Sequence, residues 1–189
     1  MAAGRIREQY GILWDGRHVE TDLQIAILDA SENSPLSVGY LDLNCLKQIN
    51  DGFGHEAGDV AVRTYFQAIS TVLADRGQGY RVGGDEVIAI LPSQDSQRAT
   101  ETMTKVCRLA MGEEIRVADR SSLTISVSVG IATTTDARKK FGELRDESDK
   151  AMYRAKQKAK ESKLSSSAIY SGQGEVLTVP SEKAMGERQ

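Results

Sequence analysis

Apolar residues recur along the chain in stretches of helical spacing that alternate with stretches of strand-like spacing. Apolar positions three and four residues apart predict four helices, over residues 19–30, 59–73, 99–110 and from 141 into a charged end. Continuous or alternating apolar runs predict strands over residues 36–43, 79–82, 86–91 and 123–131, with a short closing strand at Ile169 and Tyr170. This order of elements predicts the α/β class, as an α+β sandwich in which helices flank a mainly antiparallel central sheet.

The centre of the chain has the pattern of a tight β-hairpin. Gly83-Gly84-Asp85 separates two short strand runs, and paired glycines between such runs favour a tight turn. Asp85 and Glu86 are therefore predicted at the hairpin tip. Residues 50–58, between an earlier strand and the helix that begins at Asp59, have the composition of a polar, glycine-rich loop.

The pattern divides the chain into three parts. Residues 1–18 form a divergent N-terminal segment, whose apolar group at residues 10–14 is expected to pack on the domain. Residues 19–170 carry the periodic elements and are predicted to form the one folded domain. Residues 171–189 form a polar C-terminal tail with a small apolar patch within residues 176–179.

Composition restricts the kind of protein this can be. At 189 residues and 40% apolar content, the chain is long enough for one domain with a substantial core. Its 24 basic and 27 acidic residues give a net charge of −3, so no broad cationic surface predicts binding to nucleic acid or to a membrane. No apolar stretch approaches the roughly 20 residues of a membrane span, and the first residues lack a signal-peptide core, so we expect a cytoplasmic protein.

Three acidic residues offer candidate chemistry. Asp42 interrupts the apolar run of residues 38–43, where an unpaired carboxylate is costly to bury. If the hairpin lies beside this strand, Asp42, Asp85 and Glu86 converge. Crowded carboxylates without a nearby histidine or cysteine suit Mg²⁺ or Mn²⁺, and Mg²⁺ commonly accompanies phosphate. Taken separately, an acidic pair beside two glycines is also ordinary turn chemistry, so these residues alone leave both interpretations open.

The two cysteines do not contribute to such a site. Cys45 and Cys107 lack the spacing of a zinc or redox motif, and both lie in apolar patterns. We expect both to be buried free thiols.

The residues around the acids resemble the GGDEF family of diguanylate cyclase domains. The family hallmark is a D-x-D-x-F-K-x-x-N-D-x-x-G-H-x-x-G-D stretch, followed one helix later by R-x-G-G-D/E-E-F. The likeness extends from about Leu36 to Lys163 and includes the runs 124–132 and 148–156. The residues that match the two hallmark motifs are Asp42, Lys47, Asn50, Asp51, Gly54, His55, Gly58, Asp59, Arg81, Gly83, Gly84, Asp85 and Glu86.

The resemblance implies a palm-like fold, as in nucleotidyl cyclases and polymerases, with a ferredoxin-like core and a catalytic β-hairpin. It implies that Asp42 and Asp85 bind Mg²⁺ or Mn²⁺ through their side chains, and that Leu43 binds the ion through its carbonyl oxygen. Asp85 and Glu86 would be the catalytic residues, with Glu86 completing the acidic cluster.

The resemblance also implies a GTP site. Asn50 and Asp59 match the residues that hydrogen-bond the guanine edge, and a carboxylate that accepts from two N–H groups there favours guanine over adenine. The other substrate contacts would be to phosphates, through backbone N–H groups at a helix start or through lysine side chains. These residues are Cys45, Leu46, Lys47, Lys156 and Lys160.

The implied reaction is that of a diguanylate cyclase. The 3′-hydroxyl of each GTP attacks the α-phosphorus of the other with pyrophosphate leaving, which gives cyclic di-GMP and two pyrophosphates. Because one domain offers one GTP half-site, catalysis would require a homodimer. A sensory domain or partner that controls the reaction would lie outside this chain.

Departures from the family pattern leave two other functions open. Val87 and Leu46 replace phenylalanines, and Lys160 replaces an arginine that can hold phosphate with two N–H groups. Residues 10–17 barely resemble the family's D-x-L-T-G-L-x-N-R opening, and the charged pair of its inhibitory R-x-x-D site is missing, so product inhibition there is not expected. The alternatives are a weakly active or inactive GTP-binding signalling module, and a related synthase of another cyclic nucleotide.

Overall fold

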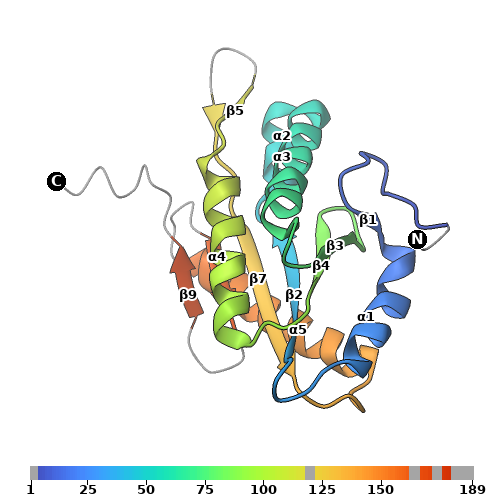
Figure 1. Cartoon of the computed structure of the whole chain (residues 1–189). Coiled ribbons are helices and arrows are strands. Elements are labelled where there is room, and N and C mark those ends of the chain that lie inside the picture. The colour runs from blue at the N-terminus through green and yellow to red at the C-terminus, as the bar shows by residue number, and fades with distance from the viewer. Residues whose placement is uncertain (1–3, 118–121, 162–166, 172–175, 180–189) are drawn as a thin grey trace.

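A seven-stranded sheet organises the part of the chain that the structure, a computed structural model, describes: residues 4–117, 122–161, 167–171 and 176–179. Its strand order is β1-β3-β4-β2-β7-β8-β9, and β5 pairs with β6 in a separate two-stranded sheet (Figure 1). The strands are β1 (Trp14–Asp15), β2 (Leu36–Leu43), β3 (Gln78–Arg81), β4 (Glu86–Leu91), β5 (Ile115–Arg116), β6 (Ser122–Leu123), β7 (Val127–Thr134), β8 (Ser167–Tyr170) and β9 (Val176–Val179). The helices are the 3-10 helix η1 (Gly16–His18), α1 (Val19–Leu28), α2 (Leu46–Phe53), α3 (His55–Leu73), α4 (Ser96–Gly112) and α5 (Phe141–Glu161).

The sheet is mainly antiparallel, as predicted. Only the β1–β3 and β7–β8 pairs within these described strands are parallel. The pairs β3–β4, β2–β4, β2–β7 and β8–β9 are antiparallel. β2 lies between β4 and β7, and all eight of its residues are buried, which explains its nearly continuous apolar sequence.

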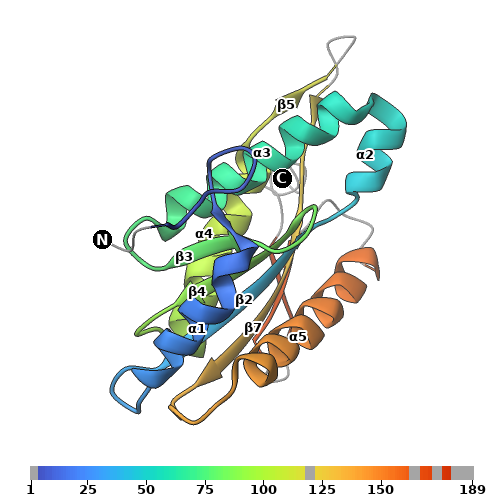
Figure 2. The same cartoon turned by 90° about the vertical axis from the view of Figure 1, so that its right-hand side faces the viewer.

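Helices cover both faces of the sheet (Figure 2). α3 and α4 pack on one face around a core that includes Phe66 and Met103. α1 and α5 pack on the other face around a second core that includes Leu23 and Leu144. Among the described residues, no helix is both long enough and apolar enough to cross a membrane.

Alternation along β2 decides which face each of its side chains occupies. Leu41 and Leu43 belong to the core under α3 and α4, whereas Val38 and Tyr40 belong to the core under α1 and α5. Asp42 therefore projects from the centre of the sheet toward the side that α5 covers.

α5 approaches the sheet closely where β7 carries Gly130. A Cβ atom at this position would overlap the backbone of α5, at the nitrogen of Met152 and the carbonyl oxygen of Ser148. Glycine is therefore required for this separation. The contact fixes α5 against β7, and so it sets how far the later residues of α5 lie from Asp42.

The predicted loop over residues 50–58 is wrong, because most of it is helical. α2 ends at Phe53 and α3 begins at His55, so one residue joins them. That residue is Gly54, whose φ of 85° is accessible to glycine and strained for other residues. Asp59 consequently lies in the second turn of α3 and not at the start of a helix.

The predicted strand over residues 123–131 is divided in the structure. β6 ends at Leu123 and pairs with β5, a strand that the sequence pattern did not reveal. β7 begins only at Val127 and continues to Thr134 within the main sheet. The apolar alternation continues across the break, so it gave no sign that the chain changes sheets.

The structure describes strands on both sides of the predicted domain, residues 19–170. Within the segment 1–18, β1 pairs in parallel with β3 and so belongs to the sheet. Within the predicted tail 171–189, β9 pairs with β8 and buries Val179 in the core, because its apolar patch can cover an open strand edge. The closing strand at Ile169 and Tyr170 is confirmed as part of β8, whereas residues 180–189 lie outside the described part of the chain.

Candidate active site

Asp42 and Glu86 lie opposite one another on neighbouring strands. The antiparallel register of β2 and β4 pairs their Cα atoms directly. Side chains at such positions share a face of the sheet, with Cβ atoms about 4.5 to 5.5 Å apart. The hairpin therefore lies beside the first strand, as the convergence of the acids requires.

Asp85 lies at the hairpin bend, directly before β4, and is partly buried. Burial raises the pKa of its carboxyl group above the ordinary value, and the negative charge of Asp42 raises it further. Lys156 acts in the opposite direction, and Glu86 adds a smaller rise. The three acids and Lys156 thus share one electrostatic environment, in which a cation is favoured.

Lys156 of α5 supplies a cation to Asp42. Its Nζ atom donates to both carboxylate oxygens of Asp42, at 2.7 and 2.8 Å. The Asp42 side chain is 7% exposed and that of Lys156 is 34% exposed, so the pair is largely shielded from water. The sequence predicted that Lys156 contacts phosphate, and in the structure it contacts the carboxylate that was predicted to bind metal.

The acids do not form a complete metal cage by themselves. Among the described residues, no three acidic, histidine or cysteine side chains are arranged to hold a metal ion. Binding of one ion by Asp42, Asp85 and Glu86 together stays a prediction. This donor set still fits Mg²⁺, which is usually held by one or two protein carboxylates together with waters and substrate phosphates. Leu43, predicted to add its carbonyl oxygen, is the last residue of β2, next to Asp42.

The start of α2 follows β2 closely and presents backbone N–H groups. Cys45 is the N-cap, has left-handed backbone angles (φ 62°, ψ 19°) and makes no capping hydrogen bond with its side chain. The first N–H groups of a helix have no acceptor within it, so those of Leu46 and Lys47 can face an anion. The predicted burial of Cys45 is wrong, because the residue is exposed, whereas Cys107 is buried as expected.

Asn50 and Asp59 come together where α2 turns into α3. The side-chain oxygen of Asn50 lies so close to the backbone of Gly58 that a Cβ atom there would overlap it. Gly58 directly precedes Asp59, so the two predicted guanine contacts are neighbours although they belong to different helices. Gly58 is therefore a requirement of this arrangement.

The remaining predicted cations are exposed on helix ends. Lys47 lies in the first turn of α2, and Lys160 lies in the last turn of α5. Residues four apart share one side of a helix, so Lys160 follows Lys156 along α5.

Asn44 contributes to the site although the sequence analysis did not single it out. It is buried and stands at the second acidic position of the family hallmark, between Leu43 and Cys45. Its Nδ2 atom donates to the hydroxyl of Ser126 at 3.1 Å, and its Oδ1 atom accepts from the hydroxyl of Ser128 at 2.7 Å. An amide can make both bonds, whereas a carboxylate can only accept. The bonds attach the turn after β2 to the start of β7.

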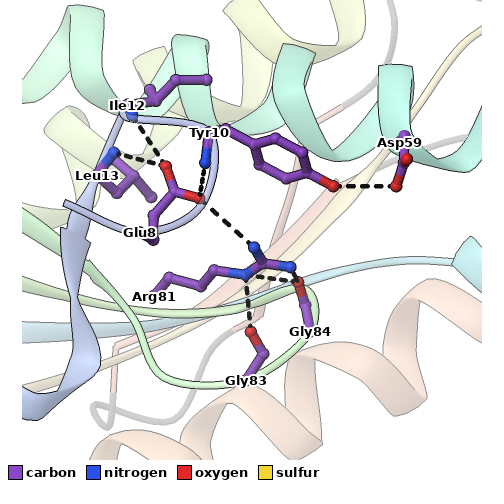
Figure 3. Close-up of polar contacts among 8 residues, drawn as sticks. All are labelled: Glu8, Tyr10, Ile12, Leu13, Asp59, Arg81, Gly83 and Gly84. Atoms are coloured by element: carbon purple, nitrogen blue, oxygen red, sulfur yellow. Dashed lines mark hydrogen bonds and ion pairs between the residues drawn. The ribbon is translucent and has the colours of Figure 1, made fainter.

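A buried glutamate orders the N-terminal segment beside the hairpin. Glu8 accepts hydrogen bonds from the backbone N–H groups of Tyr10, Ile12 and Leu13, at 2.9 to 3.2 Å (Figure 3). Its carboxylate also lies 3.4 Å from the guanidinium of Arg81. One side chain therefore fixes a loop and pairs with a residue of β3.

Arg81 connects this loop to the glycine bend. Its guanidinium donates to the carbonyl oxygens of Gly83 and Gly84 at 2.7 to 3.1 Å (Figure 3). The backbone directly before Asp85 is thereby held in place. The sequence identified Arg81 as a motif position, but it gave no indication of this role.

Tyr10 connects the same segment to Asp59. Its hydroxyl donates to the Oδ1 atom of Asp59 at 2.9 Å (Figure 3). If Leu13 is placed on the second leucine of the family's opening signature, Glu8 falls on its aspartate and Tyr10 on its first leucine. Glu8 does not stand out when the signature is aligned with residues 10–17, because the matching register begins two residues earlier.

A cavity of about 460 Å³ lies away from these residues, against α1 and β3. Asp22, Arg76 and Tyr80 are among the residues that line it, and none of the predicted site residues does. The chemistry of the side chains, and not the size of a hollow, therefore locates the candidate site.

Comparison with known proteins shows which proteins this chain is similar to. Residues 12–162 match the family model described as "Diguanylate cyclase, GGDEF domain". Diguanylate cyclase TpbB of Pseudomonas aeruginosa is 32% identical over 145 residues, which are 76% of this chain and 33% of that protein. The signaling protein YkoW of Bacillus subtilis is 34% identical over 124 residues, which are 65% of this chain and 15% of that protein. The chain thus spans only 15 to 33% of the length of the first curated relatives that it matches.

Solved structures share the fold. The GGDEF domain of YfiN (TpbB) from Pseudomonas aeruginosa has a TM-score of 0.70 at 29% identity, covering 78% of this chain and 92% of that one. The GGDEF domain of DgcB from Caulobacter crescentus, solved in complex with c-di-GMP, has a TM-score of 0.71 at 23% identity, covering 77% of this chain and 86% of that one. These likenesses confirm the palm-like α/β architecture that the sequence led us to expect.

Proposed function

Because this chain belongs to the GGDEF family of diguanylate cyclase domains, we propose that it condenses two GTP molecules into cyclic di-GMP and pyrophosphate. The observation that carries the proposal is the direct pairing of Asp42 with Glu86 next to Asp85. β2 leads from Asp42 directly to the helix start at Cys45, so a carboxylate and backbone N–H groups follow each other closely in the chain. Such a combination supports transfer chemistry at a phosphate group.

Guanine recognition is assigned to Asn50 and Asp59. The Asp59 carboxylate would accept from the ring and exocyclic N–H groups of guanine, and Asn50, whose side chain lies against the preceding Gly58, would add a further hydrogen bond. Adenine would leave these polar groups unpaired, which is strongly unfavourable in a site built for hydrogen bonding.

Phosphate binding is assigned to the start of α2 and to three lysines. The backbone N–H groups at Cys45, Leu46 and Lys47 would hold the terminal phosphates, because helix starts attract anions. The side chains of Lys47, Lys156 and Lys160 would neutralise the phosphate charge. Lys160 offers a single ammonium charge where the family has an arginine whose guanidinium can bind phosphate with two N–H groups. We therefore expect weaker GTP binding than with arginine.

The residues present fit a divalent cation. Asp42 and Asp85 would hold Mg²⁺ or Mn²⁺ through their side chains, and Leu43 would add its carbonyl oxygen, because these ions prefer oxygen ligands. The raised pKa of Asp85, caused by burial and by Asp42, supports a cation at this place. When bound, such an ion lowers the pKa of a hydroxyl group and neutralises charge on phosphoryl oxygens.

Proton transfer is assigned to Asp85 and Glu86. The attacking 3′-hydroxyl must lose its proton, and a carboxylate whose pKa lies above the ordinary value accepts a proton more readily. Burial and the charge of Asp42 raise the pKa of Asp85 in this way. Glu86, the next residue, faces Asp42 across the strand pair and completes the acidic surface.

The reaction requires two copies of the chain. Each domain offers one GTP half-site, and the two nucleotides must attack each other's α-phosphorus, so two domains must face one another about a two-fold axis. GTP is a cytoplasmic nucleotide, which is why we also propose a cytoplasmic location for this domain. Control by a sensory domain or partner is part of the proposal, because this chain matches only 15% and 33% of the length of these relatives.

One observation favours a second candidate, a GTP-binding signalling domain with little or no turnover. Lys156 already occupies both oxygens of Asp42, the first predicted metal ligand. A lysine that kept this position would compete with the metal ion, and the domain would then bind GTP without forming product. The assignment of Asn50 and Asp59 to guanine speaks against the third possibility, a synthase that uses another base.

The proposal is tested by incubating the purified chain with GTP and Mg²⁺, or Mn²⁺ in parallel, and resolving the products by mass. The wild type should form cyclic di-GMP, and Asp85→Ala should lower the rate by about 10² or more. The variant should remain folded, because burial makes the ionised Asp85 unfavourable in the folded state. Asp136→Ala is the matched control, since Asp136 is an exposed acid that pairs only with the exposed Arg138 among the described salt bridges.

The outcomes separate the candidates. Equal turnover by the wild type and Asp85→Ala would contradict the assigned site. Binding of GTP without product, at concentrations where dimers form, would favour the signalling domain.

A further inference from the structure

The hydroxyl of Tyr10 donates a hydrogen bond to the Oδ1 atom of Asp59 at 2.9 Å (Figure 3). The two residues are far apart in sequence and meet only because the N-terminal segment crosses α3. We propose that Tyr10 is a positioning residue that holds the Asp59 carboxylate in the orientation that reads guanine. The inference rests on the proposed function, because it deepens the guanine site assigned there.

Tyr10 is itself held on several sides. Its backbone N–H donates to Oε2 of the buried Glu8 at 2.9 Å, which fixes the main chain. Its ring packs against Phe66, with centroids 6.2 Å apart, and the guanidinium groups of Arg81 and Arg63 lie 5.2 and 5.7 Å from the ring centre. The hydroxyl is therefore presented to Asp59 from a rigid ring.

Asp59 needs such a partner. It lies on the exposed side of α3, where an unrestrained carboxylate can adopt several rotamers. A side chain that is already fixed loses less entropy when a ligand binds, so the hydrogen bond from Tyr10 favours binding. The bond does not block guanine, because a carboxylate has about four acceptor positions and Tyr10 uses one of them.

This contact belongs to the present chain and not to the family pattern. In the register fixed by Leu13, the signature has leucine at position 10, and leucine has no hydroxyl to donate. The tyrosine therefore adds a polar connection between the N-terminal segment and the base-binding residue.

The test compares Tyr10→Phe with the wild type on two nucleotides, GTP and inosine triphosphate. Inosine lacks the exocyclic amino group, so it offers the carboxylate one N–H group where guanine offers two. For Tyr10→Phe we expect the KM for GTP to rise about three- to tenfold with kcat within about twofold, and the preference for GTP over inosine triphosphate to fall by a similar factor. In an Asp59→Asn background, Tyr10→Phe should add no further change.

Tyr80→Phe is the matched control. Its hydroxyl also donates to an acid, Asp22, at 2.8 Å, but that pair lies on the face that α1 covers. This variant should keep both the KM for GTP and the nucleotide preference.

The result that overturns the inference is a Tyr10→Phe variant whose KM for GTP is unchanged or lower. An equal rise in the KM for GTP and for inosine triphosphate would also overturn it, because such a rise would indicate a merely structural role. If the wild type forms no product, the same comparison is made by equilibrium binding: a Tyr10-dependent preference for GTP would then support the inference while the proposed activity fails. Absence of any GTP binding by the wild type would contradict both.

Discussion

Tyr65 carries a buried hydroxyl group that has no hydrogen-bond partner within the described residues. Its ring is fully buried in α3 and packs against Phe66, with centroids 5.5 Å apart. An unsatisfied buried hydroxyl is destabilising, so Tyr65→Phe should maintain the free energy of unfolding or raise it by up to about 1 kcal/mol. Chemical denaturation of the variant and the wild type measures this difference.

Tyr80→Phe again provides the comparison, because Tyr80 is fully buried but its hydroxyl donates to Asp22. Loss of that bond should lower the free energy of unfolding by about 1 kcal/mol. If Tyr65→Phe is destabilised as much as Tyr80→Phe, the Tyr65 hydroxyl has a partner and its described environment is wrong.

The two cysteines should differ sharply in reactivity. Cys45 is exposed at the start of α2, whereas Cys107 is fully buried. Burial raises the pKa of the Cys107 thiol to about 12, so in the folded protein this group stays protonated as the pH rises past the ordinary cysteine range. At about pH 8, near the ordinary cysteine pKa, a thiol reagent should label Cys45 in the native chain and Cys107 only after denaturation. Labelling of both at equal rates in the native protein would contradict the assigned burial.

At the scale of single residues, the sequence predicts the positions of those residues that belong to a spaced motif. Asp42 and Glu86 are found opposite each other because one lies in a central strand and the other in a hairpin strand that pairs with it. The partner of Lys156 could not be predicted, because whether its ammonium group meets a phosphate or Asp42 depends on how closely α5 packs on the sheet. The role of Tyr10 depends in the same way on a loop that crosses α3.

Among the elements, α5 packs on the sheet at a distance that requires glycine at position 130 of β7. Gly130→Ala would push a Cβ atom into the backbone of α5 near Met152, so we expect the free energy of unfolding to fall by about 1 to 3 kcal/mol. Displacement of α5 would also shift Lys156, which is assigned to phosphate, and so lower the rate of product formation. Thermal or chemical denaturation, together with the cyclase assay, measures both effects.

The control for this change lies in α5 itself. Gly142 is in the first turn of α5, and a Cβ atom there would meet no other atom within 4 Å. Gly142→Ala should therefore be neutral or stabilise the protein by up to about 1 kcal/mol, since alanine favours helix. Equal destabilisation by both substitutions would mean that close packing at Gly130 does not explain the first result.

The elements that the sequence predicts well are those with a long, regular pattern. α1, β2, α4 and the β3–β4 hairpin all occur where apolar spacing placed them. The pattern fails where one residue changes the path of the chain. Gly54 joins two helices without a loop. Around Leu123 the apolar alternation continues although the chain changes from one sheet to the other. Neither event alters the apolar spacing.

For the whole molecule, both ends of the described chain are more involved in the fold than the sequence indicated. The N-terminal segment adds β1 to the sheet, and its Glu8 pairs with Arg81, which holds the hairpin bend. β9 covers the free edge of β8. Composition alone could not show this, because short strands at the edge of a sheet are too brief to produce a periodic signal.

The central claim is that two copies of this chain, each holding one GTP, form one active site. The measurement that tests it is the rate of product formation from GTP and Mg²⁺ over a range of about a hundredfold in protein concentration, with products identified by mass. The account predicts cyclic di-GMP with two pyrophosphates released for each product, and a rate per chain that rises with protein concentration until dimers predominate. The claim would be contradicted if no product containing two GMP units formed at any protein concentration, with either Mg²⁺ or Mn²⁺.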